Sequence, residues 1–444
     1  MKNSTRIALS ASLILLTYFL GYETNRTNFP QLIGLYGLFF VLYIGIFKKV
    51  NEQKDLIFFV GTAILLRFIL LFALPNFSDD LYRFIWDGRL LVQGINPFDR
   101  LPSYYIDNKI QIAGITESLY AQLNSPNYFT IYPPVNQAIF AMAAWLCPDS
   151  IWGSSLVMKS WLWLFEIGSI VLMWDLLKYF HLPAKNVLLY ALNPLTIFEI
   201  TGNIHFEGAM IFFLLLALWL LVVKKWWIGG AITMALSVAS KLLPLMFFPL
   251  LIRRVGGKKD WHLLNWQQVI LFFTIIGITL IGLYAPLLNG VFFSNFGESL
   301  NLYFQKFEFN ASVYYVLRWI GYQYKGYNVI QTLGPFLALG TLVIILGLAI
   351  KERLVNWFTL MERMLFAICV YLLCTTTVHP WYVAMPVALC VFTPFRFPIL
   401  WSGLIFLTYV NYSYSIYTEN LCVVGVEYLF VLGCAFYELR KPLV

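Results

Sequence analysis

The chain has 444 residues, of which 60% are apolar and only 12% are charged, and its mean hydropathy is +0.74. Soluble domains hold roughly 45–50% apolar residues, so this composition excludes a soluble globular protein and indicates a polytopic membrane protein. The formal net charge is +8, but the cations gather at the ends of apolar runs. That pattern indicates membrane orientation rather than a nucleic-acid partner.

Apolar stretches recur along the whole chain. A spanning helix needs ~20 apolar residues, and the sequence predicts a single all-α membrane domain over residues 1–444 with about 11–13 such helices. The first stretch, Arg6–Tyr22, has a basic start like a signal peptide but no cleavage site after it, so we expect a retained span. The candidate spans are 5–22, 32–47, 56–74, 154–177, 187–200, 206–223, 266–286, 330–350, 361–378, 381–394, 398–414 and 421–438.

Clusters of lysine and arginine set the expected orientation, because cations in short loops favour the cytoplasm. The clusters placed there are 2–6, 48–54, 178–185, 224–225, 253–259, 351–353, 396 and 440–441. Two segments must then bend. Val135–Cys147 is short and follows two prolines, so we expect it to dip into the membrane or lie along its surface. Residues 226–252 are basic at both ends, which favours a hairpin of two short helices with its tip near Lys241 over one long helix.

The stretch Asn76–Phe98 reads NFSDDLYRFIWDGRLLVQGINPF and follows an apolar span directly. Asp79 and Asp80 could merely cap a helix. The charge continues at helical spacing through Arg83, Asp87 and Arg89. We therefore expect an interfacial helix that presents its carboxylates upward and its aromatic residues to lipid. A carboxylate held in this way can accept a proton from a substrate hydroxyl as a general base.

A long loop, residues 75–134, separates the third span from the dipping segment. Loops of this length are usually functional or disordered, and this one is rich in Tyr, Asn and Pro rather than in the Ser, Glu and Lys of disorder. We expect it to be folded, extracytoplasmic and catalytic, with Tyr132 of the motif YPPVNQ at its end. Aromatic rings and amides suit a carbohydrate.

Further polar residues interrupt the later apolar runs. Asn203, His205 and Glu207 lie in a turn between two spans, where they could simply be solvated. Lys241 lies inside an apolar stretch, where an ammonium costs ~2.5–3.5 kcal/mol unless it finds an anion or water. The partner of Lys241 would be a carboxylate such as Glu166, or a phosphate.

The motif VHPWY, with His379, Trp381 and Tyr382, follows another uninterrupted span. His379 could cap the helix end, since the residue before a proline favours leaving the helix. With Lys241 and Arg83 it could instead bind a phosphate oxygen. Arg318 is a further candidate for that role, or an anchor of an interfacial segment.

With this topology, the loop opened by Asp79, the turn at 201–208, the tip at Lys241, the loop from 287 to about 328 and the segment 378–382 emerge on one extracytoplasmic face. An acid pair, cations at membrane depth and a polar aromatic loop indicate a lipid-borne phosphate that meets a hydroxyl acceptor. The sequence has no P-loop, GxGxxG, HExxH, GxSxG or paired CxxC motif, so nucleotide and zinc chemistry are not expected.

The motifs SDDLYRFIWDGRLLVQGINPF, YPPVNQ, ASKLLPLMFFPLL and HPWY resemble those of the GT-C glycosyltransferases that use polyprenyl-phosphate sugars, and the bacterial mannosyltransferase-like branches in particular. The resemblance implies a GT-C fold whose first large external loop carries the catalytic base, here Asp80 or Asp79, and inversion at the anomeric carbon. It also implies that His379 lies near the donor phosphate. The chain departs from simpler members in having two spans before the one that precedes the acidic loop.

The resemblance implies a hexosyltransferase, with mannose favoured, at the extracytoplasmic face of a bacterial inner or plasma membrane. Its partners would be a polyprenyl-phosphate sugar, a glycolipid, glycan or protein acceptor, and membrane lipids. No cofactor is expected, although Asp79, Asp80 and Glu207 could hold a divalent ion. The alternative is a transporter or flippase, because intramembrane charges and a broken helix also mark substrate pathways. The expected substrate-binding residues are Arg83, Asp87, Arg89, Tyr132, Asn203, His205, Glu207, Lys241, His379, Trp381 and Tyr382.

Overall fold

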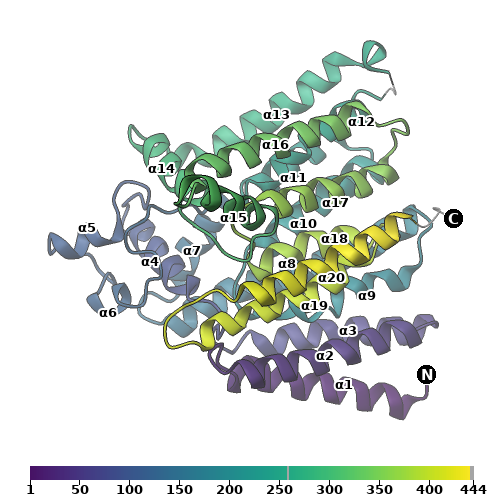
Figure 1. The fold of residues 1–444 in the computed structure, drawn as a ribbon, viewed down its shortest axis with the longest axis horizontal. Coiled ribbons are helices and arrows are strands. Elements are labelled where there is room, and N and C mark those ends of the chain that lie inside the picture. The colour runs from purple at the N-terminus through teal and green to yellow at the C-terminus, as the bar shows by residue number, and fades with distance from the viewer. Residues whose placement is uncertain (258–259, 441–444) are drawn as a thin grey trace.

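Helices build the whole of the described chain. The computed structural model describes residues 1–257 and 260–440, and Figure 1 shows their arrangement. These residues contain no β-strand, only an isolated bridge between Phe309 and Thr377. The predicted all-helical membrane fold is therefore confirmed. The cations at 258, 259 and 441, expected on the cytoplasmic face, lie outside the described residues.

Seven helices of the described residues are long and apolar enough to cross a membrane, or up to eight if the bent pair η3 and α10 counts as one span. The chain is thus a multi-pass membrane protein. The seven are α1 with η1 (Asn3–Glu23), α2 (Phe29–Lys49), α8 (Ile151–Tyr179), α13 with η6 (Trp266–Leu287), α16 (Ile330–Ile350), α17 (Trp357–Cys374) and α20 (Leu421–Arg440).

The number of long spans is smaller than predicted because several apolar runs are broken into short pieces. Prolines at 194, 386 and 398 lie in these runs, where a proline fits the first turn of a new helix but cannot continue the one before it. The pieces are η2 (Ala184–Val187), α9 (Leu188–Ala191), η3 (Thr196–Gly202), η7 (Pro380–Val383), α18 (Ala384–Cys390), α19 (Phe397–Leu404) and η8 (Ile405–Ser413). Another predicted span, α3 (Gln53–Leu70), is long enough but carries Lys54, Asp55 and Arg67.

Both termini lie at one end of the helical bundle, and two short helices of the long loop, α5 (Pro102–Asp107) and α6 (Glu117–Tyr120), project at the opposite end (Figure 1). The basic C-terminal ends of α2, α8 and α20 carry Lys49, Lys178 and Arg440. These helix ends lie at the end of the bundle that holds the termini. Cation counting assigns that end to the cytoplasm, and this orientation stays a prediction.

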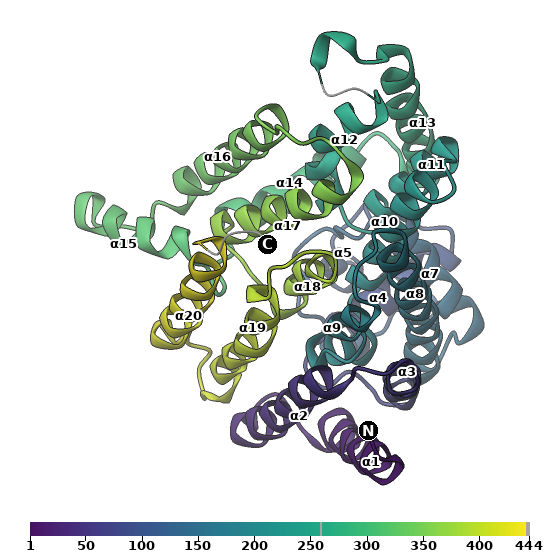
Figure 2. The same cartoon turned by 90° about the vertical axis from the view of Figure 1, so that its right-hand side faces the viewer.

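Figure 2 looks along the bundle from the end that carries the termini. Helices α1, α2 and α3 form one edge, and α13 and α16 lie on the far side from them. The short helix α18 lies near the middle, where it packs against α17 and α10 (Glu207–Val222). The broken helices are thus central, and the long spans surround them.

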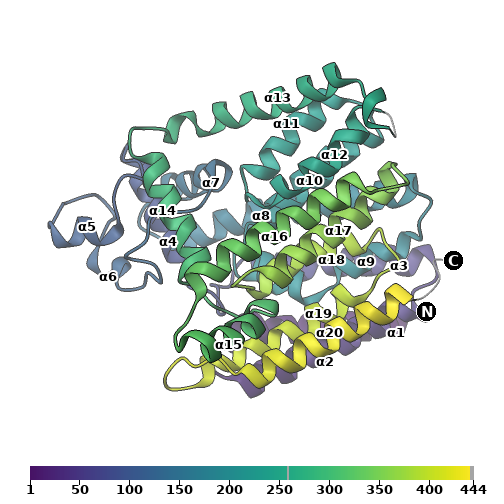
Figure 3. The same cartoon turned by 45° about the horizontal axis from the view of Figure 1, so that its top comes forward.

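The acidic stretch forms α4 (Asp80–Val92), which packs along α7 (Pro134–Leu146) under the projecting loop (Figure 3). Phe84 stacks on Phe140 of α7 with 4.6 Å between ring centroids. Phe84, Ile85 and Trp86 are each at most 1% exposed. The expectation that these aromatic residues face lipid is therefore wrong, because α7 and the loop cover the helix on that side.

Residues 226–252 fold as two short helices with a break between them. The first, α11 (Trp227–Val238), runs back along α10. After the break come η4 (Leu243–Phe247) and α12 (Phe248–Val255), both with a proline in their first turn. Lys241 lies in the break, and this is what brings an ammonium group into the interior of the bundle.

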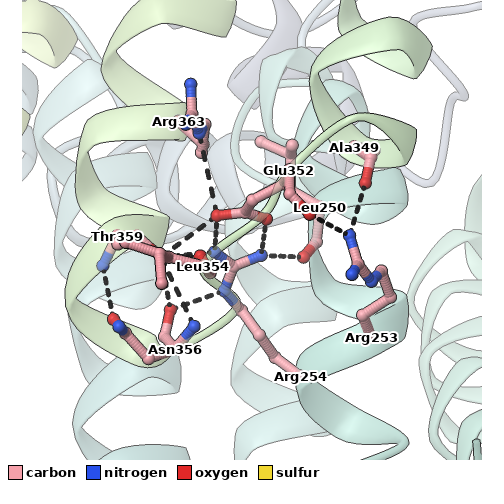
Figure 4. Close-up of polar contacts among 9 residues, drawn as sticks. All are labelled: Leu250, Arg253, Arg254, Ala349, Glu352, Leu354, Asn356, Thr359 and Arg363. Atoms are coloured by element: carbon pink, nitrogen blue, oxygen red, sulfur yellow. Dashed lines mark hydrogen bonds and ion pairs between the residues drawn. The ribbon is translucent and has the colours of Figure 1, made fainter. Parts of the chain in front are cut away.

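A buried ion pair fixes the far end of α12 (Figure 4). The two terminal nitrogens of Arg254 donate to the two carboxylate oxygens of Glu352, at 3.0 and 2.6 Å, and both side chains are 1% exposed. Thr359 adds a hydrogen bond to Glu352 at 3.0 Å, and Arg253 donates to the Glu352 backbone carbonyl at 2.9 Å. These bonds join α12 to the corner between α16 and α17.

Two further helices lie at the end with the projecting loop: α14 (Phe292–Gln305) and α15 (Val313–Lys325). A short segment between them, 307–309, pairs with the segment that leads to His379. The Phe309 amide donates to the Thr376 carbonyl at 3.1 Å, and the Val378 amide donates to the Phe309 carbonyl at 2.7 Å. The pairing fixes the backbone from which the HPWY motif starts.

Candidate active site

One cavity of about 330 Å³ collects side chains from segments far apart in the sequence. Asp79 and Asp80 at the start of α4, Lys241 in the break after α11, and the segment 379–382 before α18 all line it. The expectation that the groups near 80, 241 and 379 share a cavity is confirmed. That this cavity opens on the extracytoplasmic side stays a prediction.

The Asp80 carboxylate faces this cavity and is held by neutral donors. Its Oδ1 accepts a hydrogen bond from Asn124 Nδ2 at 2.7 Å, and its Oδ2 accepts a long one from Tyr132 Oη at 3.4 Å. The side chain is 20% exposed, and Nε2 of the His205 ring lies 4.0 Å from Oδ2. Asp80 thus has no arginine or lysine partner among the described residues.

Asp79 has a different environment from its neighbour. Its carboxylate forms an ion pair with Arg26, which comes from the loop between η1 and α2. The Arg26 guanidinium also lies over the Tyr412 ring, 4.8 Å from the centroid. Asp79 is therefore engaged in joining the first loop to α4, whereas Asp80 is directed to the cavity.

The three other charges of the acidic stretch hold the long loop in place. Arg83 lines the cavity, but it donates to Asp87 at 2.9 Å and to the backbone carbonyls of Ser125 and Tyr128 at 2.9 and 2.8 Å. Arg89 lies outside the cavity lining and donates to the Gly114 carbonyl at 2.6 Å. These hydrogen bonds from the two arginines therefore join α4 to the backbone of the long loop.

Asp87 lies under the cavity rather than in its lining and is fully buried. Besides Arg83, it accepts a hydrogen bond from Gln137 Nε2 of α7 at 3.1 Å. The pair Arg83 and Asp87 is buried and almost ideally placed, one helical turn apart on α4. Its role in this structure is to join α4, α7 and the loop that carries the Asp80 ligand Asn124.

Lys241 pairs with Glu207, whose carboxylate lies 2.9 Å from the ammonium and is fully buried. Glu166, the carboxylate partner considered from the sequence, instead accepts from Arg67 at 3.0 Å and from Tyr190 at 2.5 Å. The Lys241 side chain stays 22% exposed on the cavity side. It therefore has a buried anion behind it and open space in front.

His379 belongs to a stack of aromatic rings. Its ring lies parallel to that of Trp381 at 4.5 Å and next to that of Phe309 at 4.8 Å. Burial lowers the pKa of His379 to about 4, against the opposing attraction of Asp80, while His205 and Lys241 lower it further. The His379 ring is thus neutral at neutral pH.

Asn203, His205 and Glu207 are buried around the cavity instead of lining it. Asn203 accepts a hydrogen bond from the Phe77 amide at 3.1 Å and so holds the segment that leads to Asp80. His205 stacks on Trp381, with 3.7 Å between the ring centroids. The turn at 201–208 therefore supports both the acidic end and the HPWY end of the cavity.

Arg318 lies away from the cavity. It forms an ion pair with Glu308 and lies over the Tyr315 ring, 4.3 Å from the centroid. Tyr314 and Asn328 donate to the same Glu308 carboxylate. Arg318 thus fixes α15 to the segment before Phe309, and it does not reach the site as a phosphate ligand.

Several lining residues were missed by the sequence analysis: Arg26, Asn124, Ser299, Phe309 and Tyr412. They come from separate loops, from α14 and from η8, and no motif surrounds them. The one usable signal was the position of Arg26, an isolated cation in the loop between the first two spans. Positive charge there departs from the cytoplasmic clusters and calls for a partner.

No group of three or more His, Cys, Asp or Glu side chains is arranged to hold a metal ion within residues 1–257 and 260–440. Asp79 and Glu207, which could have shared an ion with Asp80, are paired with Arg26 and Lys241. Two of the three acids considered for a metal site therefore have protein cations as partners, and Asp80 is held by Asn124 and Tyr132 instead.

An apolar groove of about 190 Å³, the lateral groove, lies between η4, α12, α16 and α17. Thr376, three residues before His379, lines it, and so does Leu245, four residues after Lys241. Its apolar wall includes Leu245, Met246, Pro249, Ala338, Leu342 and Ile345. Residues of the groove are thus close in sequence to Lys241 and His379, the two groups that could hold an anion.

These features define a multi-pass membrane protein whose helical bundle carries a polar cavity under a folded loop, beside an apolar groove. Residues 29–255 match the family described as alpha-(1→6)-mannopyranosyltransferase, N-terminal domain. The match spans more than half of the 444 residues, so the chain belongs to this family. The family indicates a mannosyltransferase and fits the GT-C resemblance. No curated protein matches the sequence.

The matched region runs from α2 to α12. It includes Asp79, Asp80, His205, Glu207 and Lys241. The HPWY segment with His379 lies beyond it, although that segment lines the same cavity. The cavity is thus completed by helices outside the matched region.

Proposed function

We propose that the chain transfers mannose from a polyprenyl-phosphate mannose to a hydroxyl group of a glycolipid, glycan or protein, with inversion, at the extracytoplasmic face of a bacterial membrane. One observation carries the proposal: the Asp80 carboxylate and the Lys241 ammonium line the same cavity. The lateral groove supports it, because its lining residues Leu245 and Thr376 lie within four positions of Lys241 and His379 in the sequence. A base, an anion site and a path for a lipid tail are the parts that such a donor requires.

The donor would be bound by two kinds of contact. A polyprenyl tail would lie in the lateral groove, since this groove is apolar and opens between the spans α16 and α17. The phosphate would then lie near Lys241 and His379. In the sequence, Lys241 precedes the groove residue Leu245 by four positions, and His379 follows the groove residue Thr376 by three. Phosphate is a strong acceptor of charge-assisted hydrogen bonds.

In the proposed reaction, Asp80 takes the proton of the acceptor hydroxyl while the acceptor oxygen attacks C1 of mannose. The bond from C1 to the phosphate oxygen breaks, and its electron pair leaves with the polyprenyl phosphate. One displacement gives inversion. Lys241 and His379 would meet more negative charge on the leaving phosphate than on the bound donor, so they would stabilise the transition state more than the ground state.

The test is sugar transfer by purified protein in lipid nanodiscs. The donor is a synthetic polyprenyl-phosphate mannose with radiolabelled sugar, and octyl α-mannoside is the acceptor probe. The proposal predicts a labelled product whose new linkage has the opposite anomeric configuration to the donor. The Asp80→Asn variant should lose about 10²-fold or more in kcat, whereas Asp107→Asn, an exposed residue of the same loop, should match wild type.

A transporter or flippase would give another result. In proteoliposomes it would move the labelled donor between leaflets without forming a mannosylated product. Donor movement without transfer, or full transfer by the Asp80→Asn variant, contradicts the proposed reaction.

A further inference from the structure

We propose that Asp80, His205 and Glu199 form a proton relay. The proton of the acceptor passes from Asp80 to His205, while Glu199 stabilises the charged imidazole. The inference rests on the proposed function, because it needs an acceptor hydroxyl. It adds two residues to the reaction that the cavity lining does not include. The reason lies in how the His205 ring is placed.

The hydrogen bonds of His205 define its tautomer. Its Nδ1 lies 2.8 Å from the backbone carbonyl oxygen of Glu199 and 3.3 Å from Oε2 of the same residue. Both are acceptors, so Nδ1 carries the hydrogen. In a neutral ring, Nε2 is then the free base, and it points at Asp80 Oδ2 from 4.0 Å.

His205 Nε2 is buried and has no hydrogen-bond partner within the described residues. The His205 side chain is only 3% exposed, and that of Glu199 is fully buried. A buried polar atom without a partner costs roughly 1–3 kcal/mol, and such atoms in native folds call for an explanation. A proton received from Asp80 explains why this nitrogen is left free.

The backbone that carries His205 is strained. Ile204 has a φ of +58°, in the left-handed region, and for a β-branched residue this is a true outlier. Such a conformation costs on the order of 1–3 kcal/mol and clusters at functional sites. It falls at the sharp bend of 107° between η3 and α10. The strained turn directs the ring toward Asp80.

The ring and its partner are also held from the side. Trp381 stacks on His205 with an interplanar angle of 16°. Glu199 accepts hydrogen bonds from Tyr409 Oη at 2.7 Å and, at the longer distance of 3.5 Å, from Asn203 Nδ2. The His205 ring and the Glu199 carboxylate are therefore both held in place, and such preorganisation is what efficient proton transfer needs.

The proposed steps balance as follows. The acceptor O–H bond breaks, an O–H bond forms on Asp80, and the C1–phosphate bond breaks with its electrons on the phosphate. The proton on Asp80 then moves to His205 Nε2, which restores the carboxylate and leaves an imidazolium. A small rotation of the carboxylate closes the 4.0 Å gap, as catalytic contacts commonly tighten in the complex. After the product leaves, the imidazolium returns its proton to Asp80, which lines the cavity and passes it to solvent.

Acidic side chains lie beside the His205 ring. Asp80 from α4 and Glu199 from η3 are the acids that face the ring directly. Lys241 and its partner Glu207 compensate each other, and His379 behind Trp381 is neutral because burial lowers its pKa. An imidazolium formed on His205 would therefore be flanked by the carboxylates of Asp80 and Glu199.

The closing experiment compares His205→Ala, His205→Asn and wild type in the nanodisc transfer assay. In His205→Ala, kcat should fall by about 10²-fold with the donor KM within about twofold of wild type, and added imidazole should restore part of kcat with saturation. His205→Asn can keep the hydrogen bond to the Glu199 carbonyl but has nothing at the Nε2 position, so it should be folded and slow. Glu199→Gln should displace the acid limb of the pH–rate profile. His181→Asn, an exposed histidine elsewhere, is the matched control.

Full activity in His205→Asn, an unchanged pH profile in Glu199→Gln, or no imidazole rescue in a His205→Ala protein with wild-type thermal stability would each overturn the relay. The result is separable from the proposed function. If Asp80→Asn is inactive while both His205 variants behave as wild type, only the relay fails. If Asp80→Asn remains active, the assigned base itself is wrong.

Discussion

Two neighbouring carboxylates, Asp79 and Asp80, have different partners. Asp79 is bound by the Arg26 guanidinium, while Asp80 is held by an amide and a phenol and faces the cavity. A carboxylate that is engaged in an ion pair is less available to accept a hydrogen bond from a substrate hydroxyl. The structure thus favours Asp80 for proton transfer, a choice that the DD pair alone left open.

The first prediction follows from this difference. Asp80→Asn should lower the kcat of mannose transfer by about 10²-fold or more. Asp79→Asn should lower kcat less and should mainly reduce thermal stability. The cause is that Asp79→Asn leaves Arg26 without its anion at the junction of the first loop and α4. Initial rates and melting curves of both variants check this. An Asp79→Asn variant that is inactive but fully stable would reverse the assignment.

The second prediction concerns Lys241 and Glu207. Replacing Lys241 by methionine should destabilise the protein by roughly 3–5 kcal/mol, because a fully buried carboxylate loses its cation. The double variant Lys241→Met with Glu207→Gln should recover most of this stability but should not recover donor binding. Thermal unfolding and the donor KM measure the two effects. Recovery of the donor KM in the double variant would show that Lys241 serves only the ion pair.

The third prediction uses the neutral state of His379. Its pKa is lowered to about 4 by burial, below the ordinary value of 6.5. An anion bound beside the ring raises this pKa, so binding takes up a proton at pH values between the pKa of the free protein and the higher pKa of the complex. Affinity for an anion must then rise as the pH falls through this window, by up to about tenfold per pH unit.

A polyprenyl methyl phosphodiester is the suitable probe, because it keeps a single charge over this range. Its inhibition constant should decrease from neutral pH toward pH 5 in wild type and change much less in His379→Gln. Identical pH profiles for the two proteins would mean that His379 does not contact the phosphate.

At the scale of elements, the close contact of α4 and α7 positions the base. Gly88 lies against Phe140 so tightly that an added Cβ would sit 2.2 Å from the Phe140 carbonyl oxygen. Backbone cannot give way as a side chain end can. The separation of α4 from α7 therefore depends on this glycine, two helical turns after Asp80.

The fourth prediction is that Gly88→Ala forces the two helices apart, costs about 1–3 kcal/mol of stability and reduces kcat more than tenfold, since misplacing a catalytic group by about 1 Å can cost 10²-fold. Gly37→Ala in α2 is the matched control, because nothing lies within 4 Å of its added Cβ. Melting curves and initial rates test both. Normal activity in Gly88→Ala would mean that α4 does not set the position of Asp80.

Helix periodicity and the length of apolar runs predicted the class of the fold better than they predicted the individual helices. The amphipathic pattern of α4 was recognised, but its aromatic side was assigned to lipid because the covering helix α7 had no signal of its own. The break at Lys241 was recognised from the basic ends of 226–252. The broken helices around η3 and α18 were taken as simple spans, because hydropathy counts apolar residues and does not sense where prolines and turns bend them.

At the scale of the whole molecule, the distribution of cations carried the strongest information. It placed the acidic stretch, the Lys241 tip and the HPWY motif on one face, and these segments do line one cavity. It could not identify Glu207 as the partner of Lys241, Arg26 as the partner of Asp79, or Glu199 behind His205. Such pairs depend on tertiary contacts between residues that may be more than fifty positions apart, as Arg26 and Asp79 are.

The whole arrangement also separates a rigid end from the reactive end. At the end with the termini, Arg254 and Glu352 fix α12 to the corner of α16 and α17 with two buried hydrogen bonds (Figure 4). At the other end, the lateral groove lies between these same helices. The ion pair of Arg254 and Glu352 therefore fixes the helices that form the walls of the groove proposed for the donor tail.

The most direct test is a cryo-electron microscopy map of the Asp80→Asn protein in nanodiscs with polyprenyl-phosphate mannose. The account predicts phosphate density between Lys241 and His379, the sugar toward residue 80, and the polyprenyl tail along the lateral groove. Lipid-phosphate density confined to another place, such as the basic end near Lys178 and Lys185, would contradict it.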